Sequence, residues 1–541
     1  MAGKGLIVTA RSLPTRTLPS HPDLRQLKRQ AKQLLDGFIR GEGTAIAEIT
    51  AHYHGADAAT FALHDAQLVI ARAYGFESWP KLKAAVQGVT IERLTDAVRA
   101  RDLRRVRAML RLRPELAHKS ADYISPLHHA VINGDVEMVR ALMAHGANPH
   151  GGVYPYRETT GALTLARERG LTDIATIIEQ HERPHEQAGT AEGPPADAVS
   201  SSARDLYAAA ARGDVEWFRA RAAQAPLENP IEDFGGCLTV AARHNRIEVV
   251  RLLLDLGFDP NERTRFRSVG KDEVVFNWGM PLWRCAAAGR HEIAELLLER
   301  GADPNADVYA SGTPVMQAHR QGDQRMLALL EQYGGAVDAA TAGTYGLVDR
   351  ARVLLAGPQE DAPRASIAEQ LLVEAAGGGH EEIVQLALDR IDWPRDDARW
   401  FSVLEQPPRR AAGTECFRLV LARSDPNIRG RGPFGLTILH RVAGSPDQVP
   451  AEMTVAFATM LLDAGARLDV RDYLLESTPL GWACRWQRPE LVRLFLDRGA
   501  DPVEADAPEW ARPIAWAKRK GHRTILELLR DDAPANPVEH S

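Results

Sequence analysis

The sequence is poor in cysteine, in aromatic residues and in long apolar runs, and each shortage excludes something. Its four cysteines lie far apart and form no CxxC pair: Cys237, Cys285, Cys416 and Cys484. This spacing argues against a disulfide scaffold or a structural zinc site and suits a reducing compartment. No stretch approaches the roughly 20 consecutive apolar residues that a membrane-spanning helix needs, and the apolar run near the N-terminus is shorter than the core of a signal peptide. We therefore expect a cytoplasmic protein that does not act at a membrane.

Aromatic residues make up 6% of the 541 residues, so a core must be built mainly from Leu, Ala, Val and Ile. The formal net charge is -6 over this length, which gives no reason to expect a basic field for nucleic acid over the whole molecule. A hydrophobic content of 45% and a charged content of 26% are those of an ordinary folded protein. At about 150 residues per domain, the length predicts about three or four globular units.

Motifs that would indicate an enzyme are missing or out of context. The literal zinc pattern "HERPH" (181–185) needs both histidines on one helix face, and Pro184 together with the linker after it argues against that helix. The literal dinucleotide pattern "GRGPFG" (430–435) follows a turn and contains Pro433, whereas the fingerprint needs a buried strand before it. There is no Walker motif, no GxSxG elbow and no recognisable Ser/His/Asp set. We predict no enzyme, no catalytic residue, no cofactor and no metal site.

Four segments of the chain share residues at matched offsets. Each has a capping or turn position, a short apolar helix, a break, a Leu-rich helix and then a glycine with an Asp-Pro or Asn-Pro turn. The segments are "SPLHHAVINGDVEMVRALMAHGANP" (125–149), "CLTVAARHNRIEVVRLLLDLGFDPN" (237–261), "MPLWRCAAAGRHEIAELLLERGADPN" (280–305) and "TPLGWACRWQRPELVRLFLDRGADP" (478–502). Internal repetition of this kind is typical of solenoid architectures.

Each shared position has a physical reason, which the fourth segment illustrates. Thr478 can cap the first helix, and Pro479 then occupies a position whose N–H would have no partner in any case. Ala483 is small and lets neighbouring helix pairs approach closely. Leu494 belongs to the buried stripe of the second helix, and Gly499 fits the left-handed position that ends it.

The pattern resembles the ankyrin repeat, whose T-P-L-H-x-A signature and period of roughly 33 residues are matched here. Pro281 and Pro314 are 33 positions apart by direct subtraction. The resemblance extends from about residue 91 to 530, is weakest over 336–425, and implies on the order of a dozen helix pairs. Weaker copies begin near Leu94, Gly161, Leu206, Ser311, Asp338, Ala368, Ala398, Leu436 and Ala511.

The resemblance also implies roles for residues that would otherwise suggest chemistry. His128 and His440 occupy the family's histidine position, where the side chain usually makes structural hydrogen bonds at the start of the helix. Other repeats have Thr239, Trp283 or Gly481 at that position. Two of the cysteines fall at the small-residue positions of first helices, where a buried thiol acts as a small hydrophobe.

The predicted fold is an all-α, ankyrin-type α-solenoid of stacked helix pairs with short β-hairpin fingers and a helical N-terminal cap. Residues 183–203 mix Pro, Gly, Ser and charge without apolar periodicity, which predicts a linker; the alternative is one continuous solenoid with this stretch looped out. The predicted divisions are a disordered leader (1–20), the cap (21–90), a first ankyrin-like block (91–182), the linker (183–203), a second block (204–531) and a flexible tail (532–541).

The stretch "LHDAQLVIARAYGFESWPKLK" (63–83) lies in the predicted cap and does not follow the repeat pattern. Gly75 ends one helix, and Ser78 with Pro80 begins another. A solenoid needs a terminal unit that covers its apolar end. We therefore predict that Phe76 and Trp79 are structural, capping the array or holding the helices of the cap together, with ligand binding at that corner as the alternative.

Arg and aromatic residues are concentrated in the turns between repeats, where packing in a hydrophobic core does not explain them. The longest, residues 261–281, alternates in "TRFRSV" and "EVVFNW" about a Gly-Lys pair, which predicts a β-hairpin finger. Arg and aromatic residues are typical of interfaces. Counting the aromatic residues of adjoining first helices, the predicted partner-binding residues are Tyr154, Tyr156, Arg263, Arg265, Phe266, Arg267, Phe276, Trp278, Trp283, Arg431, Phe434, Tyr473, Trp482 and Trp486. Arg157, Arg429, Arg471 and Trp516 accompany them.

We predict from these features a monomeric scaffold or adaptor that binds a protein partner through its concave face and its fingers. Two alternatives stay open at this stage. Basic and aromatic fingers could bind single-stranded nucleic acid, although the chain lacks an extended basic groove. The repeats could instead direct an enzyme located in residues 1–90, a segment without an evident polar constellation.

Overall fold

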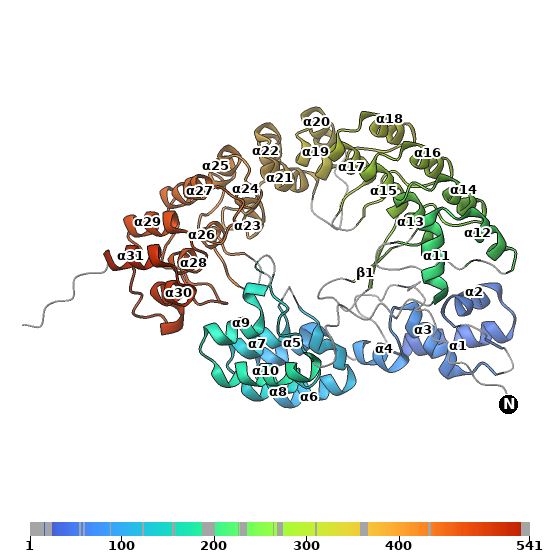
Figure 1. Cartoon of the computed structure of the whole chain (residues 1–541), viewed down its shortest axis with the longest axis horizontal. Helices are drawn as coiled ribbons and strands as arrows, with labels where there is room; N and C mark the ends of the chain where they lie inside the picture. Colours follow the sequence, from blue (N-terminus) through green and yellow to red (C-terminus); the bar gives the residue numbers. More distant parts are fainter. Residues whose placement is uncertain are drawn as a thin grey trace, which may run out of the picture. The chain divides into compact units, whose positions relative to one another are not determined.

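The computed structural model describes residues 16, 24–53, 56–57, 60–86, 88–121, 124–153, 156, 158–186, 201–224, 227, 235–262, 264–267, 274–308, 311–357, 366–430 and 434–531. The chain divides into two compact units, Met1–Pro281 and Leu282–Ser541. Each unit is helical and is described below by itself (Figure 1).

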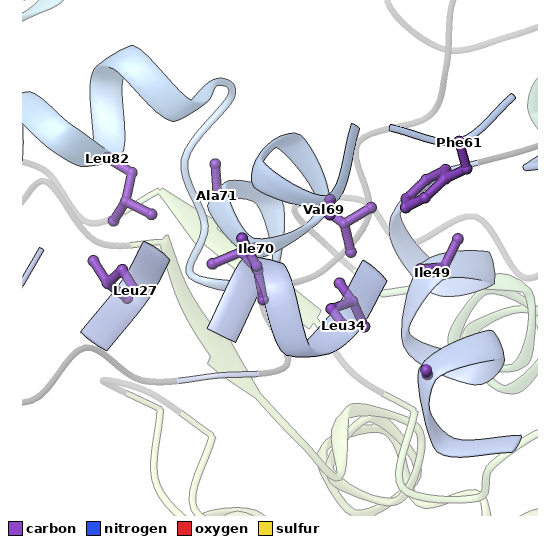
Figure 2. Close-up of a cluster of buried hydrophobic side chains, with 11 residues drawn as sticks. Leu27, Leu34, Ile49, Phe61, Val69, Ile70, Ala71 and Leu82 are labelled. Atoms are coloured by element: carbon purple, nitrogen blue, oxygen red, sulfur yellow. The ribbon is translucent and has the colours of Figure 1, made fainter. Parts of the chain in front are cut away.

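The first helices of unit 1 form a cap with its own core. They are α1 (Leu24–Ile39), α2 (Gly43–His52), α3 (Leu63–Ala73) and α4 (Trp79–Val86). Leu27, Leu34, Ile49 and Ile70 are almost fully buried in one cluster that draws side chains from all four helices (Figure 2). Helix α3 ends before Gly75, which has a φ of 83°, so the predicted break between two helices is confirmed.

Phe76 and Trp79 follow that break and pack against the cap's apolar cluster. The guanidinium of Arg113 lies 5.9 Å from the centre of the Phe76 ring, and helix α4 contacts α6 of the next helix pair. Both aromatic residues therefore hold the cap together, as predicted, and Phe76 also joins it to the repeats.

Arg16 lies in the segment that we expected to be a disordered leader, but it is firmly bonded to the cap. Its backbone N donates to the carbonyl of Ala73 at 2.9 Å. Its side chain donates to both carboxylate oxygens of Glu48, at 2.6 and 2.8 Å. This hydrogen bonding raises the pKa of Arg16. The expectation of disorder is therefore wrong at this residue.

A first run of helix pairs follows the cap in unit 1. Its elements are α5 (Ile91–Arg99), α6 (Leu103–Leu112), η1 (Pro114–His118), α7 (Pro126–Ile132), α8 (Val136–Met143), η2 (Glu158–Thr160), α9 (Ala162–Glu168) and α10 (Thr172–Glu186). First helices contact first helices, in the order α5, α7 and α9, and second helices contact second helices, in the order α6, α8 and α10 (Figure 1). Each helix pair thus buries its apolar face against its neighbours, as solenoid repeats do.

Helix α10 corrects two predictions. It extends to Glu186, and the next helix begins at Ser201, so the ends of the predicted linker (183–203) are helical. The "HERPH" pattern also lies within α10, although Pro184 was expected to exclude a helix there. Proline removes only one N–H bond, and the helix continues for two further residues. The Nδ1 atom of His181 bonds to the carbonyl of Ile177 in the same helix, at 2.8 Å.

Unit 1 ends with two more helix pairs and a pair of strands. They are α11 (Ser201–Arg212), α12 (Val215–Ala222), α13 (Cys237–Arg243), α14 (Ile247–Asp255), β1 (Thr264–Arg267) and β2 (Val274–Asn277). The strands are antiparallel, with Arg265 opposite Phe276. Residues 268–273 between them lie outside the described residues, and short projecting β-hairpin fingers as a feature of this fold stay a prediction.

Unit 2 has its own two layers of helices, arranged in pairs. After α15 (Met280–Ala288), which crosses the boundary, it contains α16 (His291–Glu299), α17 (Pro314–Gln321), α18 (Gln324–Gln332), α19 (Ala339–Tyr345), α20 (Val348–Ala356), α21 (Ile367–Gly378), α22 (Glu381–Leu388), α23 (Arg399–Leu404), α24 (Gln406–Arg410), α25 (Thr414–Leu421), α26 (Ile438–Ala443), α27 (Ala451–Asp463), α28 (Pro479–Arg485), α29 (Pro489–Asp497), η4 (Glu509–Ala511), α30 (Pro513–Lys520) and α31 (Arg523–Asp531). First helices α24, α26, α28 and α30 contact one another in sequence, and so do second helices α25, α27, α29 and α31.

The stretch with the weakest repeat pattern keeps its helix pairs. Asp338 caps α19, its side chain accepting from the backbone N of Thr341 at 2.7 Å, and Ser366 caps α21 in the same way. The next first helix is split at Glu405 into α23 and α24, because the two prolines that follow, Pro407 and Pro408, cannot donate to an unbroken helix. Among the described residues, no helix is long and apolar enough to cross a membrane.

Candidate functional site

At the family's histidine position, His128 and His440 each connect one repeat to the next. Nε2 of His128 donates to the carbonyl of Thr160 at 3.0 Å, and its Nδ1 accepts from the hydroxyl of Ser125 at 2.7 Å. His440 does the same in unit 2, with Nε2 3.1 Å from the carbonyl of Ser477. Burial lowers the pKa of His128 to about 4 and that of His440 to about 3. Both rings are therefore neutral and structural, as predicted.

Trp283 occupies the same position and takes over the same bond. Its indole Nε1 donates to the carbonyl of Ser311 at 3.2 Å, in the turn that precedes the next first helix. Ser311 O also accepts from Nε2 of Gln317 at 2.8 Å. The side chain of Trp283 is half-buried, so this predicted binding residue has a structural task and only part of its ring to offer a partner.

Where a smaller residue stands at the histidine position, a buried glutamate from the following turn accepts hydrogen bonds from the start of the first helix. Glu262 accepts from the backbone N of Gly236, Leu238 and Thr239 at 2.8–3.1 Å. The hydroxyl of Thr239 adds a further bond at 2.5 Å. Glu262 is 1% exposed, and its carboxylate satisfies the free N–H groups at the start of α13.

Glu504 has the equivalent place in unit 2, where Gly481 stands at the histidine position. Its carboxylate accepts from the hydroxyl of Thr478 at 2.5 Å and from Nη1 of Arg471 at 2.5 Å. Burial raises the pKa of Glu504, while the hydrogen bond from Thr478 acts in the opposite direction. Sequence reasoning missed both glutamates; their signal was an acidic residue two positions after the Asp-Pro turn.

The turn over residues 471–477 is closed by one buried carboxylate. Asp472 accepts from the backbone N of Leu474, Leu475 and Ser477 and from the indole Nε1 of Trp482, at 2.7–3.2 Å. Burial raises the pKa of Asp472, and the four donors oppose that shift. This network fixes the backbone on both sides of residue 473.

Tyr473, at the tip of that turn, is 60% exposed. Its backbone N donates to the carbonyl of Phe434 at 2.7 Å, which links it to the turn of the preceding repeat. The guanidinium of Arg429 lies 5.2 Å from the ring centre. Arg429 is itself held by the carbonyls of Gly435 and Arg471, at 2.6 and 3.2 Å. The structure therefore brings together Arg429, Phe434 and Tyr473, which lie on two different predicted fingers.

Other predicted binding residues differ widely in exposure. Trp278 is 46% exposed, whereas Tyr156 and Phe434 are each 9% exposed. The expectation that Trp482 and Trp516 line an accessible wall is wrong, since they are 1% and 0% exposed. Their indole N–H groups donate to buried acceptors, which are Asp472 for Trp482 and Ser477 and Ala511 for Trp516.

Trp486 remains half-buried, with the guanidinium of Arg485 4.6 Å from its ring centre and 5.2 Å from that of Trp516. The remaining candidates lie outside the described residues: Tyr154, Arg157, Arg263 and Arg431, and the side chains of Arg265, Phe266, Arg267 and Phe276. Their role stays a prediction.

Sequence reasoning also missed an aromatic and arginine cluster in the degenerate stretch. The guanidinium of Arg399 lies 4.3 Å from the centre of the half-buried Trp393 ring and pairs with the carboxylate of Asp397 at 2.7 Å. Trp400 packs edge-on against Trp393, with ring centres 4.8 Å apart. The signal in the sequence was "DWPRDDARW" (392–400), where two tryptophans flank alternating charges.

All four cysteines are buried. Burial raises the pKa of Cys416 to about 11 and also raises the pKa of Cys237, Cys285 and Cys484. Within the described ranges, His, Cys, Asp and Glu do not gather into any group of three or more that could hold a metal ion.

Comparison with known proteins agrees with the repeat geometry. Two sequence profiles, each described as ankyrin repeat, match the chain. One matches residues 122–151 and 476–504, and the other matches residues 237–265 and 280–307. The chain is also similar to Zygote-specific protein 3 of Chlamydomonas reinhardtii, at 32% identity over 87 residues. That match covers 16% of this chain and only 22% of the length of the relative. Ankyrin repeats are in general non-enzymatic modules of protein–protein interaction. The matched profiles and the stacked helix pairs together show that the chain contains ankyrin repeats.

Proposed function

We propose that the chain is a protein-interaction scaffold that binds a partner protein through the turns between its C-terminal repeats, with Tyr473 as an anchor. The observation that carries this proposal is the exposure of Tyr473, a residue that is 60% exposed although hydrogen bonds fix the backbone on both sides of it. Exposed aromatic residues that are already ordered give large contact area at low entropic cost, and they are enriched at the centres of protein interfaces.

Charged and apolar side chains surround Tyr473 on this turn. Arg429 lies against the Tyr473 ring, and Asp506, with 82% of its side chain exposed, pairs with Nη2 of Arg471 at 2.9 Å. Val503, 43% exposed, adds an apolar residue from the next turn. An aromatic anchor with a mixed-charge rim is the composition of a non-obligate protein interface.

Single-stranded nucleic acid has less support as the ligand. Base stacking needs free aromatic faces, but Trp482 and Trp516 are buried and a guanidinium group lies against the half-buried Trp486. The basic finger at residues 263–271, which would serve such binding, lies largely outside the described residues. Retention on single-stranded DNA that falls steeply with salt would favour this alternative.

The test is affinity capture from a lysate of the source cell with nuclease added, read by mass spectrometry. The full chain is compared with Tyr473→Ala and with the control Val353→Ala, which removes a residue of similar exposure (59%) from helix α20. We expect one or more proteins to be retained by the wild type and the control and lost with Tyr473→Ala. Equal retention by all three baits would rule out Tyr473 as the anchor. If none of the baits retained a protein, the scaffold proposal itself would fail.

A further inference from the structure

Helix α6 carries an unusual concentration of arginine on its outer face. The segment 93–113 contains eight arginines, no lysine and only two acidic residues, Asp96 and Asp102. Within α6 (Leu103–Leu112) there are four arginines and no carboxylate. All four of these arginines, at positions 104, 105, 107 and 111, are exposed, whereas Val106, Met109 and Leu110 are buried.

Three of these arginines form a straight stripe, which we call the α6 arginine stripe: Arg104, Arg107 and Arg111. Residues at i, i+3 and i+7 lie on one side of a helix, and the rise of 1.5 Å per residue spreads the stripe over about 10 Å. Leu112, which is 60% exposed, borders the stripe. The buried side of α6 faces helices α4 and α8, which it contacts, so the stripe points to solvent.

Among the residues that the structure describes, few acidic groups neutralise this stripe. Arg107 lies 3.6 Å from Glu137 of α8, but both side chains are at least half exposed, so the pair is weak. The Asp102 carboxylate caps the helix by accepting from the backbone N of Arg105 at 2.9 Å. Over the part of the chain that the structure describes, Arg104 and Arg111 have no ion pair and no side-chain hydrogen bond.

We infer that the α6 arginine stripe docks an acidic helix of a partner protein, whose carboxylates repeat along one face. This inference rests on the proposed scaffold function and names the chemistry of one segment of the partner. Arginine forms two parallel bonds to a carboxylate through its planar fork. A helix with Glu or Asp at matching spacing presents carboxylates at the same rise, and Leu112 supplies an apolar contact beside them.

Other polyanions fit the stripe less well. Helix α6 has no aromatic residue on which nucleotide bases could stack, and three guanidinium groups over about 10 Å would contact few phosphates of a duplex. A membrane surface needs a broad apolar face as well as cations, whereas Leu112 is a single exposed apolar residue bordering the stripe.

The experiment measures fluorescence anisotropy of a labelled, Ala-based helical peptide with Glu repeated at the spacing of the stripe (i, i+3 and i+7), titrated with the full chain. The triple variant Arg104→Glu, Arg107→Glu and Arg111→Glu is expected to weaken binding about tenfold or more, through lost attraction and new repulsion. The matched control is Arg25→Glu, Lys28→Glu and Lys32→Glu, which reverses three exposed charges at the same i, i+3 and i+7 spacing on α1. We expect the control to bind nearly as the wild type does.

Three further arms complete the test. Replacing the three arginines by lysine keeps charge and fold but removes the planar fork, and we expect a several-fold weaker affinity. Tyr473→Ala should leave peptide binding unchanged, so that loss of partner capture and loss of peptide binding are separate results. Equal weakening in the α1 control would mean that only bulk charge attracts the peptide and would overturn the inference. The same holds if the stripe retains a 20-base-pair DNA or phosphatidylserine vesicles but not the peptide.

Discussion

The indole N–H of Trp283 donates to the carbonyl of Ser311 across 3.2 Å, and it does so from the position at which His128 and His440 make the equivalent bond. A tryptophan and a histidine are very different in size, but each offers one ring N–H at a similar reach. Where a ring stands at this position, histidine and tryptophan can therefore make the same bond to the next repeat. This explains why an aromatic residue type alone does not assign Trp283 to partner binding.

Replacing Trp283 tests that relationship. Trp283→Ala removes the donor and half-buried ring area and should destabilise the repeat by about 2 kcal/mol. Trp283→His keeps a ring N–H donor and should therefore destabilise the repeat clearly less than Trp283→Ala does. Hydrogen exchange of the amides in α17 would measure the effect locally, because opening of one repeat need not unfold the whole array. Equal protection in both variants would mean that the bond contributes nothing.

The buried histidines predict a loss of stability in mild acid. The pKa of His128 is about 4 and that of His440 about 3 in the folded chain, against about 6.5 when unfolded. Below pH 6.5 the unfolded chain therefore binds protons that the folded chain does not, so stability is full above pH 6.5 and falls as the pH drops toward 4 or 3. The raised pKa of Asp472 acts in the opposite direction.

The variant His440→Gln isolates the histidine contribution. Its free energy of unfolding should be lower than that of the wild type at pH 7.5. The difference in this free energy should shrink by a few kcal/mol at most between pH 6.5 and pH 4. Thermal unfolding followed by circular dichroism at a series of pH values would measure it. Parallel pH profiles for both chains would show that His440 is not the titrating group.

The buried carboxylate of Glu262 should be one of the costlier side chains to remove. Glu262→Ala leaves three backbone N–H groups at the start of α13 without their acceptor, and each buried unsatisfied donor costs about 1–3 kcal/mol. Some of this cost will be relieved by water entering the site. A double-mutant cycle with Thr239→Ala measures the coupling between the two side chains, and a coupling near zero would contradict the hydrogen-bond network.

Gly435 should control the position of Tyr473. A Cβ atom at residue 435 would lie 2.3 Å from the Tyr473 ring, and the φ of 57° is strained for a residue with a side chain. Gly435→Ala is therefore expected to displace the ring and reduce partner capture to a similar degree as Tyr473→Ala. Gly257→Ala, with a φ of 86° and nothing within 4 Å of the added Cβ, is the matched control. Undiminished capture with Gly435→Ala would argue against a fixed Tyr473 as the anchor.

Much of this fold could be predicted because its signals are local. Thr478 with Pro479, and Gly499 after the second helix, mark the ends of a helix pair through capping and backbone geometry alone. The 33-residue spacing then identifies the family, and the break at Gly75 separates two helices of the cap. The rule that proline ends a helix failed at Pro184, because α10 continues through this residue to Glu186.

The aromatic residues were harder to assign, because exposure depends on neighbours that are distant in sequence. Trp482 and Tyr473 both lie in or beside an inter-repeat turn, and composition treats them alike. Asp472 binds the indole of Trp482, so that ring turns inward, while the backbone bond to Phe434 holds Tyr473 at the surface. Glu262 and Glu504 were missed for the same reason, since a glutamate in a turn is ordinarily solvated.

By itself, the sequence determined the helix pairs, their period and their caps, because each depends on residues within one or two turns of the chain. The tertiary structure alone decided which rings are buried and which carboxylates serve as caps. It also decided which arginines of α6 make no ion pair within the described residues. The physical reason is that burial and pairing are properties of the contact between repeats, which are about 33 residues apart and meet only when the array is stacked.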